Sequence, residues 1–238
     1  MTEVLENISR EIIPSYLDRF VGGSYKDSWT LTQINDLGYG HVPFGGQGKS
    51  GKTMNAHGMI ELCPDLRNRP KAFYGLPDVS IFPADYQAYA VSDLDQIDPG
   101  SIAFIDDIAR LFPSRDSRDT TLQRFMGLIS HKDILIISTV QSYKNADQCL
   151  FRDQVVVPMV KTFSPFGVYF EREEFTLYAK AANALIPDFE ALSGIDRHML
   201  VFSPLCPEVL AIDAPSWYGR VHSHSLRNAK ILEGKNRG

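Results

Sequence analysis

A glycine-rich stretch at residues 45–53, Gly-Gly-Gln-Gly-Lys-Ser-Gly-Lys-Thr, constrains the fold of this 238-residue chain more than any other feature. From Gly46 onward it fits the pattern G-x-x-x-x-G-K-[ST]. In that pattern glycines let backbone N–H groups converge on phosphate oxygens without interference from a Cβ. A helix that begins where the loop ends adds the positive end of its dipole. The stretch therefore predicts a phosphate-binding loop between a buried strand and a helix.

The side chains of this loop predict a nucleoside triphosphate as the ligand. Lys52 would reach the β- and γ-phosphates, and the Thr53 hydroxyl would bind Mg²⁺. A flexible Gly/Lys/Ser turn without a ligand is the alternative, so the neighbouring strands have to decide between the two. The residues expected to bind nucleotide are Gly46, Gln47, Gly48, Lys49, Ser50, Gly51, Lys52 and Thr53.

A second motif follows the turn at residues 98–100, where the apolar stretch Ile102–Ile105 predicts a buried strand and the acids Asp106 and Asp107 come directly after it. Ligands of open α/β sheets bind outside the carboxyl ends of the strands, so these acids should lie near the phosphate loop. We expect Asp106 to hold Mg²⁺, directly or through water, and Asp107 to activate the attacking water. A plain strand-to-turn exit is the alternative interpretation.

A further buried strand is predicted at Ile134–Ile137, and the polar residues Ser138, Thr139 and Gln141 follow it. A polar side chain at the end of such a strand can contact the γ-phosphate or the hydrolytic water. We expect Gln141 to take this role. A Ser/Thr-rich loop without a role in chemistry is the alternative.

Helices and strands alternate along the rest of the chain. Before the loop, helices are expected over residues 3–13 and Ser15–Val21, and a short strand over His41–Phe44, in which Pro43 removes a ladder donor. Later helices are expected at Thr53–Leu62, Thr120–Ile129 and Glu173–Leu185, the last closed by Pro187. Later strands are expected at 71–74, 155–160, 167–170, 199–202 and 209–212, with 155–160 and 167–170 as a hairpin-like pair.

Composition favours a folded intracellular protein. Apolar residues make up 44% of the chain and charged residues 22%, no apolar run approaches the roughly 18 residues of a membrane span, and three scattered cysteines indicate reduced thiols. The net charge of −5 argues against wholesale coating of nucleic acid. We predict one domain over 1–238, with a helical appendage at 1–40, a core at 41–213 and a basic tail at 214–238.

The order of these motifs resembles that of P-loop ATPases with an extra strand between the Walker A strand, which leads into the phosphate loop, and the Walker B strand, which ends in the acids. Residues 130–142, Ser-His-Lys-Asp-Ile-Leu-Ile-Ile-Ser-Thr-Val-Gln-Ser, followed by Leu-Phe-Arg-Asp at 150–153, resemble the FtsK–HerA superfamily of DNA translocases. The small size is similar to that of genome-packaging ATPases from tailless, membrane-containing viruses. The resemblance covers about residues 41–170. It implies an α/β fold of the RecA-like (ASCE) P-loop NTPase type, a three-layer sandwich with a mostly parallel central sheet.

For function, the resemblance implies an ATP-hydrolysing translocase of double-stranded DNA that uses ATP and Mg²⁺. Lys52 and Thr53 match the family's Walker A residues, Asp106 its metal-handling acid and Gln141 its sensor. The family acts as rings, which implies a homo-oligomer, a hexamer or pentamer. A capsid or portal-vertex protein would be a further partner, and the host cytoplasm or the virion the location.

The ring implies an arginine that reaches the γ-phosphate of the neighbouring subunit. Arg152 is the first candidate, and Arg124, Arg118 and Arg115 are rivals. Asp107 departs from the glutamate that is usual at its position, which makes its role less secure than that of Asp106. Loops near 113–119 or the basic tail would contact DNA.

Two other functions remain open. A small-molecule kinase could use the arginines at 115–118 in a lid over phosphates, although a separate sensor strand argues against it. A nucleotide-gated assembly protein would bind ATP tightly and turn it over slowly, because Asp107 is too short to drive hydrolysis.

Overall fold

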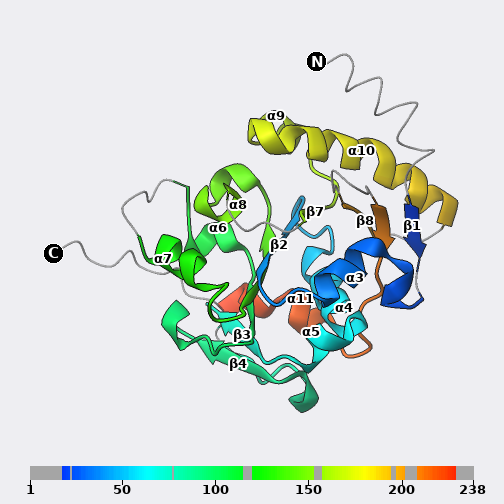
Figure 1. Ribbon diagram of the computed structural model, residues 1–238. Helices are drawn as coiled ribbons and strands as arrows, with labels where there is room; N and C mark the ends of the chain where they lie inside the picture. Colours follow the sequence, from blue (N-terminus) through cyan, green and yellow to red (C-terminus); the bar gives the residue numbers. More distant parts are fainter. Residues whose placement is uncertain are drawn as a thin grey trace.

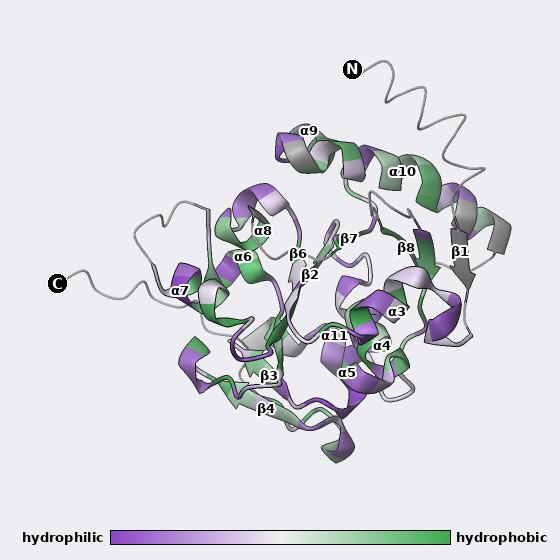
Figure 2. Ribbon diagram, in the orientation of Figure 1, coloured by the Kyte–Doolittle hydropathy of each residue, from purple (hydrophilic) through white to green (hydrophobic). Residues whose placement is uncertain are grey.

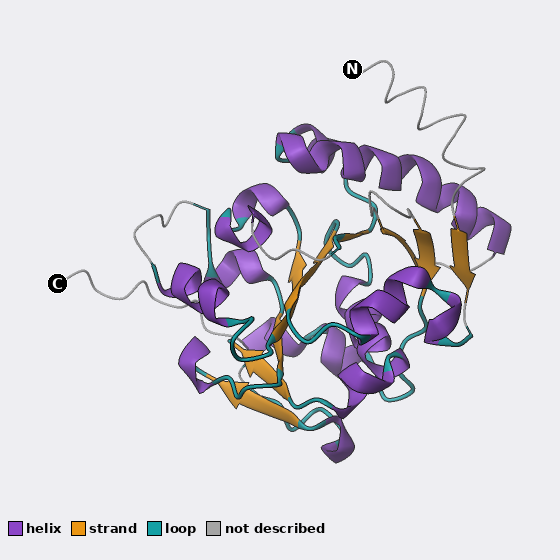
Figure 3. Ribbon diagram, viewed as in Figure 1, coloured by secondary structure: helices purple, strands orange, loops and turns teal. Residues whose placement is uncertain are grey.

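The computed structural model describes residues 18–21, 23–76, 78–114, 120–152, 157–193, 197–201 and 208–228. These residues form one sheet in the order β1-β9-β8-β7-β2-β6-β5-β3-β4 (Figures 1 and 3). All neighbouring pairs are parallel except that β8 runs antiparallel to β7 and β9. The strands are β1 (Asp18–Val21), β2 (Gly40–Gly45), β3 (Lys71–Tyr74), β4 (Ala88–Val91), β5 (Ile102–Ile105), β6 (Leu135–Val140), β7 (Met159–Val160), β8 (His198–Val201) and β9 (Glu208–Ala211).

Helices cover both faces of the sheet, so the predicted three-layer α/β architecture is confirmed. Side chains alternate between the faces of a strand. In β5, Ile102 and Phe104 enter the core under α3, α4 and α5, whereas Ala103 and Ile105 enter the core under α7, α8 and α10. In Figure 2, β8 and part of α10 beside it carry the hydrophobic colour. The α-helices described are α3 (Trp29–Asn35), α4 (Lys52–Leu62), α5 (Pro64–Asn68), α6 (Ile108–Leu111), α7 (Thr121–Leu128), α8 (Cys149–Arg152), α9 (Pro165–Tyr169), α10 (Glu173–Ser193) and α11 (Arg220–Ser223).

Strand β2 is central and fully buried in spite of its proline. The N–H of Gly40 donates to Ile134, on the β6 side, and the carbonyl of Gly45 accepts from Lys161, on the β7 side. Because peptide groups alternate sides along a strand, the N–H that Pro43 lacks would point toward β7. The pairing with β7 covers only Phe44 and Gly45. The proline therefore sits where no ladder partner is required.

The first strand corrects the prediction of a short helix over Ser15–Val21. Within the described part, Asp18–Val21 is a strand that pairs in parallel with β9 along its whole length. Pairing with an open sheet edge outweighs a weak local helical pattern. Helix α3 then buries Leu31 and Ile34 completely. This part of the expected appendage therefore belongs to the sheet and its core, while the helix expected over 3–13 lies outside the described residues.

The strand predicted over 167–170 is wrong, because this segment lies in helix α9 and the turn after it. Ser164 caps the helix by accepting a hydrogen bond from the N–H of Gly167 at 3.0 Å, and Pro165 occupies its first turn. The hairpin-like pair is therefore wrong as well. Strand β7, at the end of the strand predicted over 155–160, pairs with β2 and β8, and residues 155–156 lie outside the described residues.

Helix α10 continues past Pro187, where we expected it to end. An internal proline costs about 3 kcal/mol, because it removes a helical hydrogen bond. Burial offsets this cost, since Ala182 and Ile186 pack in the core beneath the helix and Pro187 itself is exposed. The other predicted helices and strands are present among the described residues with small differences at their ends. None of the described helices is long and apolar enough to cross a membrane.

The start of the expected basic tail is also part of the fold. Trp217 and Leu226 pack against the core that contains α4 and β5. Helix α11 and a 3-10 turn at Ser225–Asn228 continue this segment. The described tail therefore lies against the body of the protein, and residues 229–238 lie outside the described part.

Candidate functional site

The loop between β2 and α4 has the backbone of a phosphate cradle. Gly46 and Gly51 have φ angles of 146° and 86°, which favour glycine, and Lys49 at the loop's tip also has a positive φ, of 63°. A Cβ on Gly46 would lie 2.9 Å from the Cβ of Lys161, so the loop cannot carry a side chain there without a shift. The two glycines therefore fix the turn that places α4 behind the loop.

Two polar side chains in the loop, those of Lys52 and Ser50, are placed where they could contact phosphate oxygens. The Nζ of Lys52 is nearly buried and donates to the carbonyl oxygens of Gly46 and Gln47 at 2.7 and 2.8 Å. The Oγ of Ser50 is buried and has no hydrogen-bond partner among the described residues. Phosphate oxygens are strong acceptors for an ammonium and a hydroxyl. The loop therefore fits the phosphates of a nucleotide, as its sequence predicts.

A chain of hydrogen bonds joins this loop to the two acids. Thr53, in the first turn of α4, donates its hydroxyl to Asp106 Oδ1 at 3.0 Å. Thr139, near the end of β6, donates its hydroxyl to the same oxygen at 2.6 Å and accepts from the N–H of Asp107 at 2.8 Å. These bonds bring together the ends of β5, β6 and α4. The structure thus assembles Thr53, Asp106 and Asp107 as the sequence predicts, and adds Thr139, which the sequence placed only among several polar residues.

Asp107 lies in an unusual conformation that suits its residue type. Its φ of 51° and ψ of 62° are left-handed, which Asp and Asn adopt more readily than other residues with a side chain. This gives a local reason for the shorter acid where glutamate is usual. Burial, and then the charge of Asp106, raise the pKa of the Asp107 carboxyl, while Arg110 and Lys52 partly oppose the shift.

Gln141 is exposed at the end of β6, beside the tip of the phosphate loop. Its Oε1 lies 3.7 Å from the position that a Cβ on Gly48 would take. Strand β6 lies between β2 and β5. It is therefore the extra strand that the sequence predicts between the loop and the acids. Gln141 therefore faces the loop from the strand next to it.

Two residues that no sequence motif singles out hold the turn after Gln141. Glu171, almost fully buried, accepts from the N–H groups of Tyr143 and Lys144 at 3.1 and 2.8 Å. Arg172 donates to the carbonyl oxygens of Tyr143 and Ala146 at 2.8 and 2.5 Å. Only the folded chain brings the start of α10 to this turn, so no local sequence signal could have found the pair.

Of the four arginines predicted as candidates for the finger, only Arg124 has a side chain in the described part of the structure. Arg152 ends α8, which is held to the middle of the sheet because Leu150 accepts a hydrogen bond from Nδ1 of His41 at 2.7 Å. The side chain of Arg152 is outside the described part of the structure, as are all atoms of Arg115 and Arg118. Arg124 is exposed on α7.

No family model and no curated protein sequence matches this chain. Among solved structures, the genome-packaging NTPase B204 from Sulfolobus turreted icosahedral virus 2, in complex with ATP-gammaS, has a TM-score of 0.50 at 13% identity, covering 72% of this chain and 96% of that one. The DNA-packaging ATPase B204 from Sulfolobus turreted icosahedral virus has a TM-score of 0.50 at 11% identity, covering 71% and 96%. The fold is that of P-loop ATPases. The predicted resemblance is therefore confirmed for the fold, which this chain shares with these two packaging ATPases.

The P-loop site fits Mg²⁺ only together with a nucleotide. Among the described residues, no group of three or more His, Cys, Asp or Glu side chains could hold a metal ion by itself. Thr53 and Asp106 offer two adjacent oxygens that already share a hydrogen bond. Mg²⁺ typically takes one or two protein oxygens, several waters and phosphate oxygens of the substrate. These two side chains would therefore hold the ion against bound ATP.

ATP binding is expected to take up a proton at alkaline pH. Burial lowers the pKa of Lys52 to about 8, against the opposing charges of Asp106 and Asp107. Above that pH much of the free protein has a neutral Lys52, and the phosphates would raise its pKa again. Calorimetry of ATP binding at about pH 8.5, in two buffers with different ionisation enthalpies, measures the uptake. The uptake should vanish at pH 7. It should persist in Lys49→Ala, which alters an exposed residue of the loop. Equal binding enthalpies in the two buffers at the higher pH would contradict the lowered pKa of Lys52.

Proposed function

We propose that this protein hydrolyses ATP with Mg²⁺ and uses the energy to translocate double-stranded DNA. The observation that carries the hydrolytic part is the junction at Asp106 Oδ1, which accepts hydrogen bonds from Thr53 and Thr139 at 3.0 and 2.6 Å. It ties the phosphate loop, the acids and the sensor strand into one site. A ligand-free glycine turn or a plain strand exit would not require the phosphate loop, β5 and β6 to meet at one carboxylate oxygen.

The roles within the site follow from these positions. Lys52 would leave the loop carbonyls and donate to the β- and γ-phosphate oxygens, where its charge stabilises the transition state. Asp107 would accept a proton from the attacking water, and its raised pKa brings it closer to the range of an efficient base. Gln141 would orient the same water or the γ-phosphate. Bound Mg²⁺ would neutralise negative charge on the phosphates.

The motor part of the proposal rests on the sensor strand and on the fold. Strand β6 carries Gln141 beside the loop, and Glu171 and Arg172 bind the turn that follows it. A change at the γ-phosphate would therefore reach the residues just before α10 through the side chains of Glu171 and Arg172, which bond to the backbone of this turn. The B204 proteins with this fold are described as genome-packaging and DNA-packaging enzymes.

For this chain we propose a ring homo-oligomer, a hexamer or pentamer, in the host cytoplasm or the virion. A capsid or portal-vertex protein would be a further partner.

Arg152 is the arginine that we propose for the neighbouring subunit's site. The variant Arg152→Ala should lose ATP hydrolysis by about 10³-fold or more, because an arginine finger neutralises charge that develops in the transition state. Mixing it with Lys52→Ala subunits should restore part of the hydrolysis, since each variant supplies what the other lacks. Arg124→Ala, which alters an exposed rival candidate on α7, is measured in parallel and should keep most of the activity. Normal activity of Arg152→Ala alone would show that the finger is elsewhere.

A kinase is the second candidate function, because the same loop and acids could serve phosphoryl transfer to a hydroxyl of a small molecule. Hydrolysis in ¹⁸O-labelled water separates the two. We expect the label in released phosphate, with no phosphoryl transfer to added nucleosides or nucleotides. A phosphorylated acceptor that carries no ¹⁸O, together with a strictly monomeric protein, would favour the kinase. Tight ATP binding without turnover would favour a nucleotide-gated assembly protein.

A further inference from the structure

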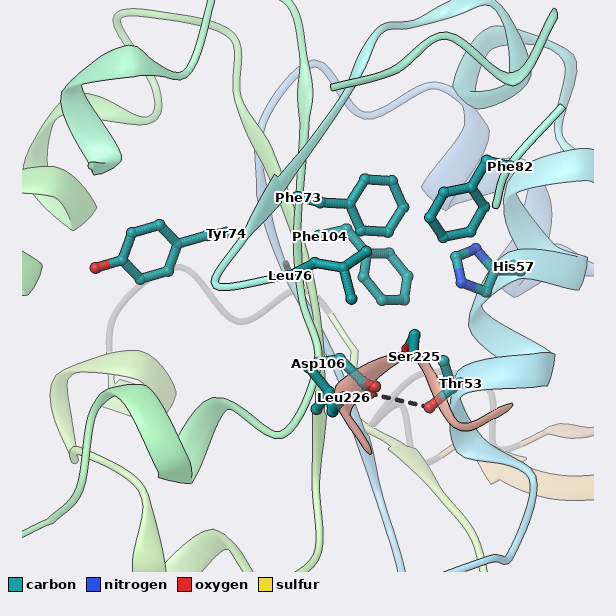
Figure 4. A pocket seen from close by; sticks show the side chains of 10 residues that line it. All are labelled: Thr53, His57, Phe73, Tyr74, Leu76, Phe82, Phe104, Asp106, Ser225 and Leu226. Carbon is teal, nitrogen blue, oxygen red and sulfur yellow. Dashed lines mark hydrogen bonds between the residues drawn. The ribbon is translucent and has the colours of Figure 1, made fainter. Parts of the chain in front are cut away.

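The C-terminal segment Trp217–Leu226, which we call the C-terminal strap, lies against the metal side of the P-loop site. Ser225 and Leu226 line a small pocket together with Thr53 and Asp106, the two residues expected to hold Mg²⁺ (Figure 4). The aromatic side chains of Phe73, Phe82 and Phe104 close its far side. The space measures about 10 Å³, roughly what one water molecule requires.

The strap is anchored by directed contacts. His222 is buried, accepts at Nδ1 from the N–H of Gly219 at 3.0 Å and donates from Nε2 to the carbonyl oxygen of Ile81 at 2.9 Å. The indole of Trp217 packs edge-on against the ring of Tyr86, with centroids 4.9 Å apart. These contacts hold the strap on the core in a single position.

His57 links the strap to both halves of the nucleotide site. It lies one helical turn after Thr53 on α4 and stacks on Phe104, two residues before Asp106, at 4.5 Å and 5° between ring planes. Its ring also contacts Trp217 at 5.5 Å and Tyr218 at 5.8 Å. A shift of α4 or β5 on ligand binding would therefore alter the contacts of His57 with Trp217 and Tyr218 in the strap.

Tyr218 adds a polar group on the same side. Burial, and then the negative charge of Asp106, raise the pKa of its hydroxyl. A protonated phenol and the hydroxyl of Ser225 are both hydrogen-bond donors and acceptors. The strap thus brings two neutral hydroxyls toward the acid that is expected to handle the metal.

We propose that the C-terminal strap is part of the nucleotide site: Ser225 holds a water molecule of the hydrated Mg²⁺, and binding of Mg²⁺ with ATP changes the environment of the strap. The inference rests on the proposed ATP site. Mg²⁺ keeps several of its waters in proteins, and Thr53 and Asp106 supply only two oxygens. The pocket has room for one such water, and Ser225 is the hydroxyl that the strap contributes to its lining.

The fluorescence of Trp217 tests the proposal without relying on turnover. Trp29→Phe removes the other tryptophan, which lies on α3 and is 40% exposed. A non-hydrolysable ATP analogue is titrated with and without Mg²⁺, and its binding is measured in parallel by calorimetry. We expect the Trp217 signal to change only with Mg²⁺ present and with the same midpoint as binding. Binding without any change in the Trp217 signal would overturn the inference and spare the proposed function, whereas no binding at all would overturn both.

Ser225→Ala then tests the water contact. It should raise the Mg²⁺ concentration that gives half of the Trp217 change by about three- to tenfold, as expected for loss of one hydrogen bond to a charged centre. Ser223→Ala is the matched control, because Ser223 is exposed on the same strap and bonds only to carbonyl oxygens of Gly219 and Arg220. Equal Mg²⁺ midpoints for the two variants would overturn the role of Ser225.

Discussion

Replacing Lys52 with alanine is expected to weaken ATP binding about 10- to 150-fold and to reduce hydrolysis by at least a further 10²-fold. The ammonium group is the nearly buried cation of the loop, and its present partners are two backbone carbonyls that it can leave for phosphate oxygens. Hydrogen bonds to charged groups contribute about 1.5–3 kcal/mol, which gives the loss in binding. Loss of a donor that stabilises transition-state charge gives the loss in turnover.

Equilibrium binding of a fluorescent ATP analogue and steady-state phosphate release measure the two effects of Lys52→Ala. Lys49→Ala is the control, since Lys49 is exposed and neighbours Lys52 in the same loop. Its binding constant should change far less. Unaltered binding and turnover in Lys52→Ala would show that the loop does not hold the phosphates.

The second large effect is expected for Asp107→Asn, which should keep ATP binding and lower hydrolysis by about 10²- to 10⁴-fold, the usual contribution of a general base. Asparagine tolerates the left-handed backbone of this position as well as aspartate does, so the variant removes the charge without straining the turn. The N–H that bonds to Thr139 is also retained. Single-turnover measurements with pre-bound ATP separate the chemical step from binding.

The pH dependence supplies a control for the role of Asp107. Because burial and Asp106 raise its pKa, the wild-type rate should begin to fall at a higher pH than the value near 4 of an ordinary aspartate. The fall comes with decreasing pH, since the base must be ionised to accept a proton. Persistent turnover in Asp107→Asn, with the same acid limb as the wild type, would place the base elsewhere.

The sequence predicts that Thr53, Asp106 and Asp107 lie together because each is close in sequence to the strand or helix that positions it. The loop at 45–53 sets its own geometry through glycine, and a buried strand delivers Asp106 and Asp107 to the sheet edge wherever the strand lies. The position of β6 between β2 and β5 is implied by the resemblance and not by a local pattern. Pro43 is unexpected from the sequence, because the sequence does not show that β7 pairs only with Phe44 and Gly45 of β2.

The errors arise where tertiary contacts decide. Asp18–Val21 becomes a strand because β9 offers an edge, and α10 passes Pro187 because the helix buries apolar side chains such as Ala182 and Ile186 just before it. The exposed aromatic residues at 166–170 imitate a strand, although a serine cap and a proline start a helix there. The strap could not be predicted either. The basic residues of the predicted tail at 214–238 suggest a segment that contacts DNA, whereas Trp217 and His222 pack its first part against the core.

Phosphate release from ATP, measured with and without double-stranded DNA, tests the central claim most directly. We expect DNA to raise the steady-state rate severalfold, with an effect that grows with DNA length and weakens as salt screens the phosphate backbone. Lys52→Ala should abolish the rate under both conditions. A rate that is the same with and without DNA, over a range of DNA lengths and salt concentrations, would contradict the proposal that this site drives a DNA translocase.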